Sequence, residues 1–319
     1  MISSCFGEFF MIDRKPKVTI GICVRNGAST VKETVKSIVA QDFPHDSMEI
    51  IFVDDGSQDN TLSIIQNHAL DIDIPTKVFH TSWKGLGRAR NIVIDNATGE
   101  YILWVDADMM LSDDYVTKIV DFMDRNPKVG IAKGRLTLEP SENVLATLET
   151  YSRAVSKMVD FNSEKTLSKA IGTGGSIYRS AVIRQAGKFD ENLRGYGEDW
   201  DLEIRVRARG WLVSIIDAKL FDYERLGVTW KNLWQKYWLR GYHSHYFLHK
   251  NPGLIKHYRM FPPAAFLTGV IHAQKLANMV HKSMVFFLPI QYVFKMTAWY
   301  FGFLVSHLNS YHPKSRATH

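Results

Sequence analysis

Residues 17–139 alternate short apolar, β-branched runs with longer amphipathic runs. We expect strands over residues 17–24, 48–55, 76–80 and 101–108, and helices over residues 29–41, 86–97 and 113–125, with one more beginning near Asp59. Ser29 and Asp59 are the expected caps of two of these helices. This order predicts an α/β fold with a doubly wound, Rossmann-like, mostly parallel sheet and helices on both of its faces.

The remainder of the chain is less regular. Helical patterns cover residues 143–159 and 198–209, strand patterns cover 170–178 and 211–217, and apolar helical patterns follow from Trp230, over 260–280 and over 284–305. The last segment is long enough to cross ~30 Å of hydrocarbon. Lys295 in its middle would cost about 3 kcal/mol there, so a full span and an interfacial helix pair with 260–280 both stay open.

Polar side chains follow three of the predicted parallel strands. They are Arg25 and Asn26, Asp54 and Asp55, and the Asp106-Ala107-Asp108 segment. Ligands of doubly wound sheets bind beyond the carboxyl ends of the strands. The topology therefore predicts that these side chains gather at one binding site.

Asp106 and Asp108 would point the same way if their strand stays extended. Two such carboxylates can share a hard Mg²⁺ or Mn²⁺ ion, which would bridge two phosphates and offset the charge of a departing diphosphate. The alternative is a solvated turn. Asp54 and Asp55 would accept hydrogen bonds from a base or a ribose, or would serve only the turn that follows them.

Three glycine-containing segments add candidates. Residues 83–91 (WKGLGRARN) open a helix with cations, which favours an anion there, although the segment lacks a Walker or GxGxxG spacing. Residues 197–201 (GEDWD) offer a carboxylate as general base, or only acidic residues at a helix N-terminus. Residues 172–176 (GTGGS) allow the close approach of a ligand, or form a bulge.

The charge of the chain is divided unevenly. Residues 225–319 contain 12 Lys and Arg and no Asp or Glu, whereas the remainder has a net charge of −6. A basic, aromatic tail favours an anionic partner, and its apolar runs fit membrane headgroups better than nucleic acid. The two cysteines provide neither a disulfide framework nor a zinc site, which is typical of a reducing, cytosolic setting.

Six segments together resemble the family-2 glycosyltransferases of the GT-A fold. In family order they are VTIGICVRNG, SIVAQDFP, IIFVDDGSQDNT, GRARNIVIDNATGEYILWVDAD, GTGGSIYR and GEDWDLEIRVRARGW. The resemblance covers residues 17–225. It divides the chain into an N-terminal extension (1–16), a GT-A catalytic domain (17–225) and a helical membrane-association region (226–319).

The resemblance implies an inverting transfer of a sugar from a nucleotide-diphosphate sugar to a hydroxyl of a glycan or lipid-linked sugar. It implies Mg²⁺ or Mn²⁺ at Asp106 and Asp108, and Asp199, with Glu198 beside it, as the catalytic base. The implied nucleotide-sugar site contains Arg25, Asn26, Asp54, Asp55, Lys84, Arg90, Asp106 and Ala107, and the implied acceptor side contains Gly174, Gly175, Ser176 and Trp200. Nucleotide sugars are made in the cytosol, so the catalytic domain is expected to face it.

Two positions depart from the family pattern. The first strand ends in Cys23-Val24-Arg25-Asn26 instead of Pro-x-Tyr-Asn, so Arg25 would stack on or pair with the base in place of a tyrosine. Tyr223 occupies the place of a metal-binding histidine found in many relatives. Asp222 is a possible substitute, and otherwise Asp108, diphosphate and water remain as metal ligands.

Two rival functions remain. A polyprenyl-phosphate glycosyltransferase shares the first four segments, but its phosphate acceptor is already anionic and needs no base, so Glu198 and Asp199 favour a hydroxyl acceptor. A catalytically silent module that binds a membrane or a partner would keep the fold. The intact acidic motifs argue against that second reading.

Overall fold

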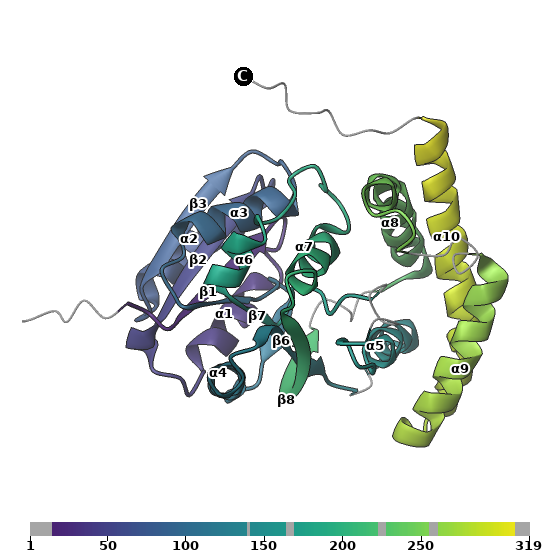
Figure 1. Cartoon of the computed structure of the whole chain (residues 1–319), viewed down its shortest axis with the longest axis horizontal. Coiled ribbons are helices and arrows are strands. Elements are labelled where there is room, and N and C mark those ends of the chain that lie inside the picture. The colour runs from purple at the N-terminus through teal and green to yellow at the C-terminus, as the bar shows by residue number, and fades with distance from the viewer. Residues whose placement is uncertain (1–14, 139–140, 164–168, 223–227, 255–260, 310–319) are drawn as a thin grey trace, which may run out of the picture.

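The computed structural model describes residues 15–138, 141–163, 169–222, 228–254 and 261–309. In these residues an eight-stranded sheet has the order β3-β2-β1-β4-β7-β6-β8-β5. Figure 1 shows this sheet with helices against it, and a separate group of helices packed to one side. The chain is thus a mixed α/β protein with a C-terminal helical extension.

The first four strands confirm the predicted parallel half. They are β1 (Val18–Val24), β2 (Met48–Asp55), β3 (Thr76–Thr81) and β4 (Tyr101–Trp104). β1 lies between β2 and β4, and β2 also pairs with β3, all in parallel. Since parallel strands end at the same edge, the polar residues that follow them lie at that edge.

The second half of the sheet differs from the prediction. The strand expected over 101–108 ends at Trp104, the chain then turns, and β5 (Met109–Leu111) begins a new pairing with β8 (Leu212–Asp222). Of the strand expected over 170–178, the structure keeps only β7 (Ser176–Arg179), which runs antiparallel to β4. β6 (Val129–Leu136) has no counterpart in the sequence prediction, and it joins β7 to β8.

Helices cover both faces of the sheet, as predicted. α1 (Val31–Val39), α2 (Thr61–Asp71) and α4 (Tyr115–Arg125) share one apolar core with the strands. α3 (Leu86–Asn96), α6 (Ser180–Gln185) and α7 (Glu198–Arg207) share the other core. The predicted caps are each one residue off, because Thr30 and Asn60 precede the first turns of α1 and α2.

The remaining helices form the extension. Their bounds are α5 (Val144–Ser156), α8 (Trp230–Lys250), α9 (Pro262–Val280), the short η5 (Ser283–Phe287) and α10 (Leu288–Leu308). α5 and α8 lie between the sheet and the outer pair α9 and α10 (Figure 1). α8 and α10 approach closely because Gly241 and Gly302 face backbone carbonyl oxygens of the opposite helix, where a Cβ would overlap.

No helix within the described residues combines the length and the apolar character needed to cross a bilayer. The midpoint of the predicted 284–305 segment is occupied by a buried Lys295, which pairs with Glu149 of α5. Trp230 and Trp234, which belong to the basic, aromatic tail, pack their rings on Phe294 of α10. These side chains serve packing between helices.

Candidate active site

A cleft of about 780 Å³ lies at the carboxyl edge of the parallel strands. It brings together residues predicted from separate segments: Arg25, Asn26, Arg90, Asp106, Ala107, Asp108, Gly174, Glu198, Asp199 and Trp200. Burial raises the pKa of Cys23 at the end of β1 to about 12, and the charges of Arg90, Asp106 and Asp55 also act on this thiol. The strand ends therefore share one electrostatic environment.

Asp106 and Asp108 lie in the turn after β4, not on an extended strand. The amide of Met109 donates to the carbonyl of Asp106 at 3.0 Å, which closes this turn. Burial and the neighbouring Asp108 raise the pKa of Asp106, while Arg90, Lys133 and Arg153 oppose that shift. Gly174 packs directly against the Asp106 carboxylate, where any Cβ would overlap it.

Two adjacent carboxylates that disfavour each other's charge suit a divalent cation. Within the described residues, no group of three or more His, Cys, Asp or Glu side chains is arranged to hold a metal alone. A site with two carboxylates fits Mg²⁺, which often keeps waters and takes phosphate oxygens as further ligands. Tyr223, which takes the place of the metal-binding histidine of many relatives, lies outside the described residues, as does the side chain of Asp222.

Asp54, Asp55 and Lys84 do not line the cleft. Asp54 is fully buried, and it accepts hydrogen bonds from the Ser57 hydroxyl and from His80 Nδ1, the latter at 2.7 Å. Asp55 accepts from the backbone amides of Lys84 and Gly85, both at 3.0 Å. The contacts of both acids fix the loops that precede α2 and α3.

Arg25 has an aromatic partner that the sequence analysis missed. Its guanidinium lies 5.0 Å from the centre of the Trp83 ring, and the Trp83 side chain is 52% exposed. Asn26 has a positive φ of 54° and its side chain accepts from the amide of Gln58 at 2.8 Å. Arg25 and Trp83 therefore form a flat, partly exposed platform at the end of β1.

The two acids that begin α7 have different environments. Glu198 is buried and its Oε1 accepts from Arg90 Nη1 at 2.7 Å. Burial and the adjacent Asp199 raise the pKa of Glu198 to about 7. Asp199 is half-buried and lines the cleft, and its Oδ1 accepts from the amide of Trp200. Asp199 is thus the carboxylate that a substrate can reach, whereas Glu198 is tied to Arg90.

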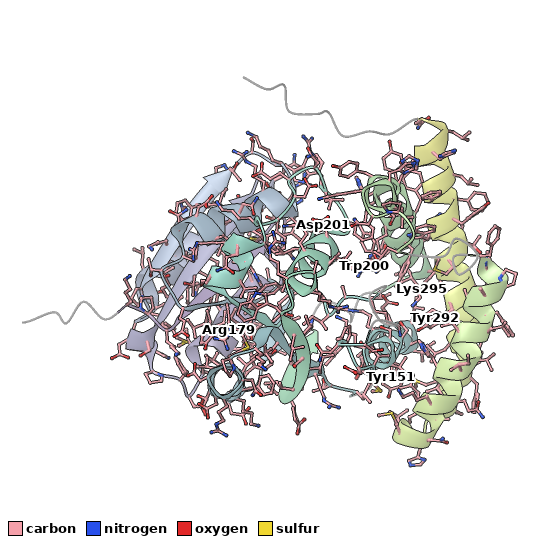
Figure 2. The ribbon with its side chains drawn as sticks, in the orientation of Figure 1. Tyr151, Arg179, Trp200, Asp201, Tyr292 and Lys295 are labelled. Atoms are coloured by element: carbon pink, nitrogen blue, oxygen red, sulfur yellow. The ribbon has the colours of Figure 1, made fainter. Side chains whose placement is uncertain are left out.

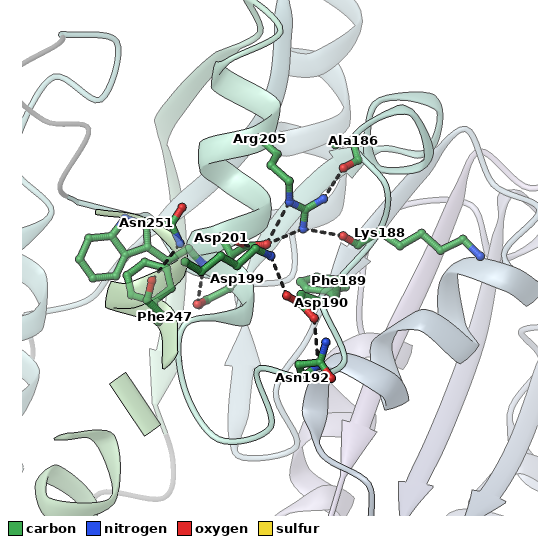
Figure 3. A network of polar contacts seen from close by, with 12 residues as sticks. Ala186, Lys188, Phe189, Asp190, Asn192, Asp199, Asp201, Arg205, Phe247 and Asn251 are labelled. Carbon is green, nitrogen blue, oxygen red and sulfur yellow. Dashed lines mark hydrogen bonds and ion pairs between the residues drawn. The ribbon is translucent and has the colours of Figure 1, made fainter. Parts of the chain in front are cut away.

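Ion pairs hold α7 in place behind these acids. Arg205 donates to Asp201 and to the carbonyls of Ala186 and Lys188, as the dashed lines in Figure 3 show. Lys250 of α8 pairs with both Asp190 and Asp201, at 2.6 and 2.8 Å. The position of Asp199 therefore depends on contacts of α7 with α8 and with the segment that follows α6.

The extension completes the cleft with residues that the sequence analysis had assigned to a membrane or had not singled out. They are Ser152, Arg153, Ser156 and Lys157 around the end of α5, Tyr237 and Arg240 of α8, and Tyr292, Lys295 and Met296 of α10. Figure 2 shows Tyr292 and Lys295 on the side of α10 that faces α5. The signal was present in the sequence, because a lone lysine in an apolar helix requires a buried partner.

Two of the residues predicted for the acceptor side, Gly175 and Ser176, do not line the cleft. Ser176 is fully buried and its hydroxyl donates to the carbonyl of Gly172 at 2.5 Å. Gly175 has a positive φ of 73°, and its carbonyl accepts from the Tyr115 hydroxyl. Both residues fix the backbone of the glycine segment, and Gly174 presents that segment to the cleft.

The sequence model of glycosyl transferase family 2 matches residues 19–186, more than half of the chain. The chain belongs to glycosyl transferase family 2. The match runs from β1 through α6, so it includes the turn with Asp106 and Asp108 and the glycine segment. It also includes α5, and it stops before α7 and the C-terminal helices α8, α9 and α10. Of the helices beyond the match, α7, α8 and α10 contribute residues to the cleft.

Known proteins with similar sequences or folds agree with this placement. The poly-beta-1,6-N-acetyl-D-glucosamine synthase of Staphylococcus epidermidis is 25% identical over 229 residues, or 69% of this chain and 53% of the synthase. The chain thus spans about half the length of the curated relatives it matches.

Two solved structures share the fold. The mannosyltransferase PcManGT from Pyrobaculum calidifontis, in complex with GDP-Man and Mn²⁺, has a TM-score of 0.64 and 17% identity, covering 92% of this chain and 88% of that one. Residues 1–349 of S. aureus TarS, in complex with UDP-GlcNAc, have a TM-score of 0.50 and 14% identity, covering 92% of each chain. The fold is therefore of the GT-A type.

Proposed function

We propose that this chain transfers a sugar from a nucleoside diphosphate sugar to a hydroxyl group of a glycan or lipid-linked sugar, with inversion at the anomeric carbon. One observation carries the proposal: the Asp106–Asp108 turn and Asp199 line a single cleft, although they are far apart in the sequence. A leaving diphosphate needs a cation, which a pair of carboxylates can hold. An attacking hydroxyl needs a carboxylate as general base, and both must lie within reach of one sugar.

Asp106 and Asp108 would hold a Mg²⁺ or Mn²⁺ ion. A bound divalent cation supplies charge that neutralises the departing diphosphate. Arg90, Lys133 and Arg153 also favour the charged form of Asp106. The binding of Mn²⁺ together with GDP-Man in the mannosyltransferase with this fold supports the assignment.

Arg25 and Trp83 would hold the base of the nucleotide. Both offer flat surfaces, and a guanidinium already stacked on an indole can extend that stack to a further ring. Asp54 and Asp55 contribute by fixing the loops around this platform. The identity of the donor is narrowed only by similar proteins, which include ones bound to UDP-GlcNAc and to GDP-Man.

Asp199 would accept the proton of the acceptor hydroxyl as that oxygen attacks the anomeric carbon. A hydroxyl is a weak nucleophile near neutral pH unless a carboxylate takes its proton in the transition state. Glu198 serves as a positioning residue, because its carboxylate is buried against Arg90. A single displacement from the face opposite the diphosphate inverts the configuration.

A nucleotide-binding measurement tests the donor part of this proposal. We expect UDP or GDP to bind with Mn²⁺ present and to bind at least about tenfold more weakly after chelation, a loss of roughly 1.4 kcal/mol. Asp108→Asn should give a similar loss with Mn²⁺ present, whereas Asp114→Asn, an exposed acid paired with Lys118, should bind normally. Calorimetric titration measures both. If no nucleoside diphosphate binds, the silent-module reading replaces the proposal.

We also propose that the extension docks on an anionic membrane surface from the cytosolic side. Large apolar side chains on α9, η5 and α10 are exposed by 47–64%, namely Phe266, Leu267, Ile271, Phe286, Phe287 and Ile290. Residues 225–319 contain no acidic residue that anionic headgroups would repel. Such a surface would bring the enzyme to lipid-linked acceptors.

Vesicle flotation tests the docking proposal. Wild-type protein should float with phosphatidylglycerol vesicles at low salt, and a Phe286→Ser, Phe287→Ser double variant should bind at least about tenfold more weakly, since each buried ring contributes on the order of 2 kcal/mol. Leu70→Ser on α2, which removes a side chain that is 85% exposed, is the control. Retention on DNA without flotation would favour nucleic acid as the partner instead.

A further inference from the structure

A second cavity of about 640 Å³ adjoins the cleft. Lys133 of β6, Arg153 of α5 and Lys157, just beyond α5, line both cavities. We refer to these three side chains as the cationic wall. Asp106, Asp108 and Asp199 line the cleft but not the second cavity. Among the described residues, the acidic residue that lines the second cavity is Asp160.

The cationic wall gathers like charges in little space. Lys133 Nζ donates to the carbonyl oxygen of Ile171 at 3.1 Å, and Lys157 Nζ donates to the same oxygen. Burial, together with Lys133 and Arg153, holds the pKa of Lys157 well below its usual range. Cations that are brought together in this way oppose one another, and a bound anion would relieve that repulsion.

The cationic wall also lies next to the proposed base. Gly172 has a φ of +74°, and a Cβ built there would lie 3.3 Å from Asp199 Oδ2, 3.5 Å from Lys157 Nζ and 4.0 Å from Lys133 Nζ. One substrate molecule can therefore contact the carboxylate and both ammonium groups. Its hydroxyl would be at Asp199 and an anionic group would lie beyond it.

The rest of the second cavity is lined by apolar side chains together with the polar Arg135, Asp160, Asn162 and Ser214. Its lining includes Leu136, Leu138, Met158, Val159, Leu220 and Met279. Met279 belongs to α9, one of the helices with exposed apolar side chains, and is itself 47% exposed. The cavity thus continues from the cationic wall toward the surface that we propose docks on a membrane.

We propose that the cationic wall binds a phosphate group of the acceptor, so that the acceptor is a phosphate-bearing glycan or glycolipid. This inference rests on the proposed function, because it takes Asp199 as the group that meets the acceptor hydroxyl. The phosphate does not react. It positions the hydroxyl, while the diphosphate of the donor would lie beside Asp106 and Asp108, which line the same cleft.

Calorimetric titration with inorganic phosphate and with hexyl phosphate tests this site, first on the protein alone and then with Mn²⁺ and UDP or GDP already bound. Both probes should bind in both states, and Lys157→Gln or Arg153→Gln should weaken their binding by about tenfold or more, since a hydrogen bond to a charged group contributes roughly 1.5–3 kcal/mol. Arg125→Gln removes an equal charge from an exposed site on α4 and should have no effect. Thermal melting of each variant verifies that it is folded.

The two probes also distinguish the source of the phosphate. Tighter binding of hexyl phosphate indicates a lipid phosphate, because the alkyl chain gains from the apolar part of the cavity. Equal binding indicates a phosphate within a soluble glycan. Displacement of either probe by the nucleotide, or wild-type affinity in both folded cationic-wall variants, would overturn the proposal. Failure of any nucleotide to bind would contradict the proposed function instead, and the titration without nucleotide still tests the cationic wall.

Discussion

Asp199→Asn is expected to lower the rate of sugar transfer by about 10²–10⁴, the usual contribution of a general base. The asparagine keeps the size of the side chain and can still accept from the amide of Trp200, so the start of α7 should keep its structure. Nucleotide affinity and the melting temperature should therefore match the wild-type protein. Initial rates with a panel of nucleotide sugars, measured beside calorimetry with UDP and GDP, separate the loss of chemistry from the loss of binding.

Two further variants sharpen this test. Asp217→Asn removes an exposed carboxylate on β8 and should leave the rate unchanged. Glu198→Gln removes the carboxylate that pairs directly with the buried Arg90 guanidinium, so it should lower the melting temperature as well as the rate. Near-normal turnover of Asp199→Asn would remove Asp199 from the mechanism and would favour a polyprenyl-phosphate acceptor, which needs no base.

Glu149→Gln should reduce the free energy of unfolding by about 3–5 kcal/mol, because it leaves Lys295 charged and buried. Glu149 and Lys295 are 1% and 4% exposed, and Lys295 Nζ donates to Glu149 Oε2 at 2.9 Å. Replacing both residues, Glu149→Leu with Lys295→Met, should restore part of this loss, since no uncompensated charge remains. Urea unfolding measures all three proteins, and Glu33→Gln, from the exposed Glu33–Lys36 pair, should change stability by less than about 0.5 kcal/mol.

The same ion pair predicts a dependence of stability on pH. Burial alone would raise the pKa of Glu149 above its ordinary value of 4.5. The nearby cations, of which Lys295 has the largest effect, outweigh burial and lower this pKa to about 2. The contribution of the Glu149 carboxylate to the free energy of unfolding is complete above pH 4.5. It is lost as the pH falls toward 2, because the unfolded chain binds the proton first. The wild-type protein should lose about 3 kcal/mol more than Glu149→Gln over this range. Equal losses in the two proteins would show that the pair does not stabilise the fold.

Local patterns were sufficient to predict the parallel half of the sheet. β2 begins and ends where the apolar run MEIIFVDD predicts, and α3 and α7 lie within two residues of their expected ends. Neighbouring residues in the chain supply these signals. β6 escaped prediction because it is stabilised by β7 and β8, which come 40 or more residues later in the chain.

The sequence predicted polar residues at the ends of the parallel strands. That these residues meet at one edge of the sheet followed from the parallel order alone. Only the tertiary structure decided which acid faces a substrate. Glu198 and Asp199 are adjacent in the sequence but differ in their access to a substrate. Arg90, more than 100 residues away in the chain, donates a hydrogen bond to Glu198.

The amino-acid sequence by itself determined the α/β class, the pair of acids Asp106 and Asp108 after the fourth parallel strand, and the basic character of the last 95 residues. The tertiary structure decided where that basic charge goes. Lys295 and Arg240 line the cleft, because burying a charge requires a partner, and Glu149, the partner of Lys295, lies 146 residues away in the chain. A pairing over such a distance leaves no periodic trace in the sequence.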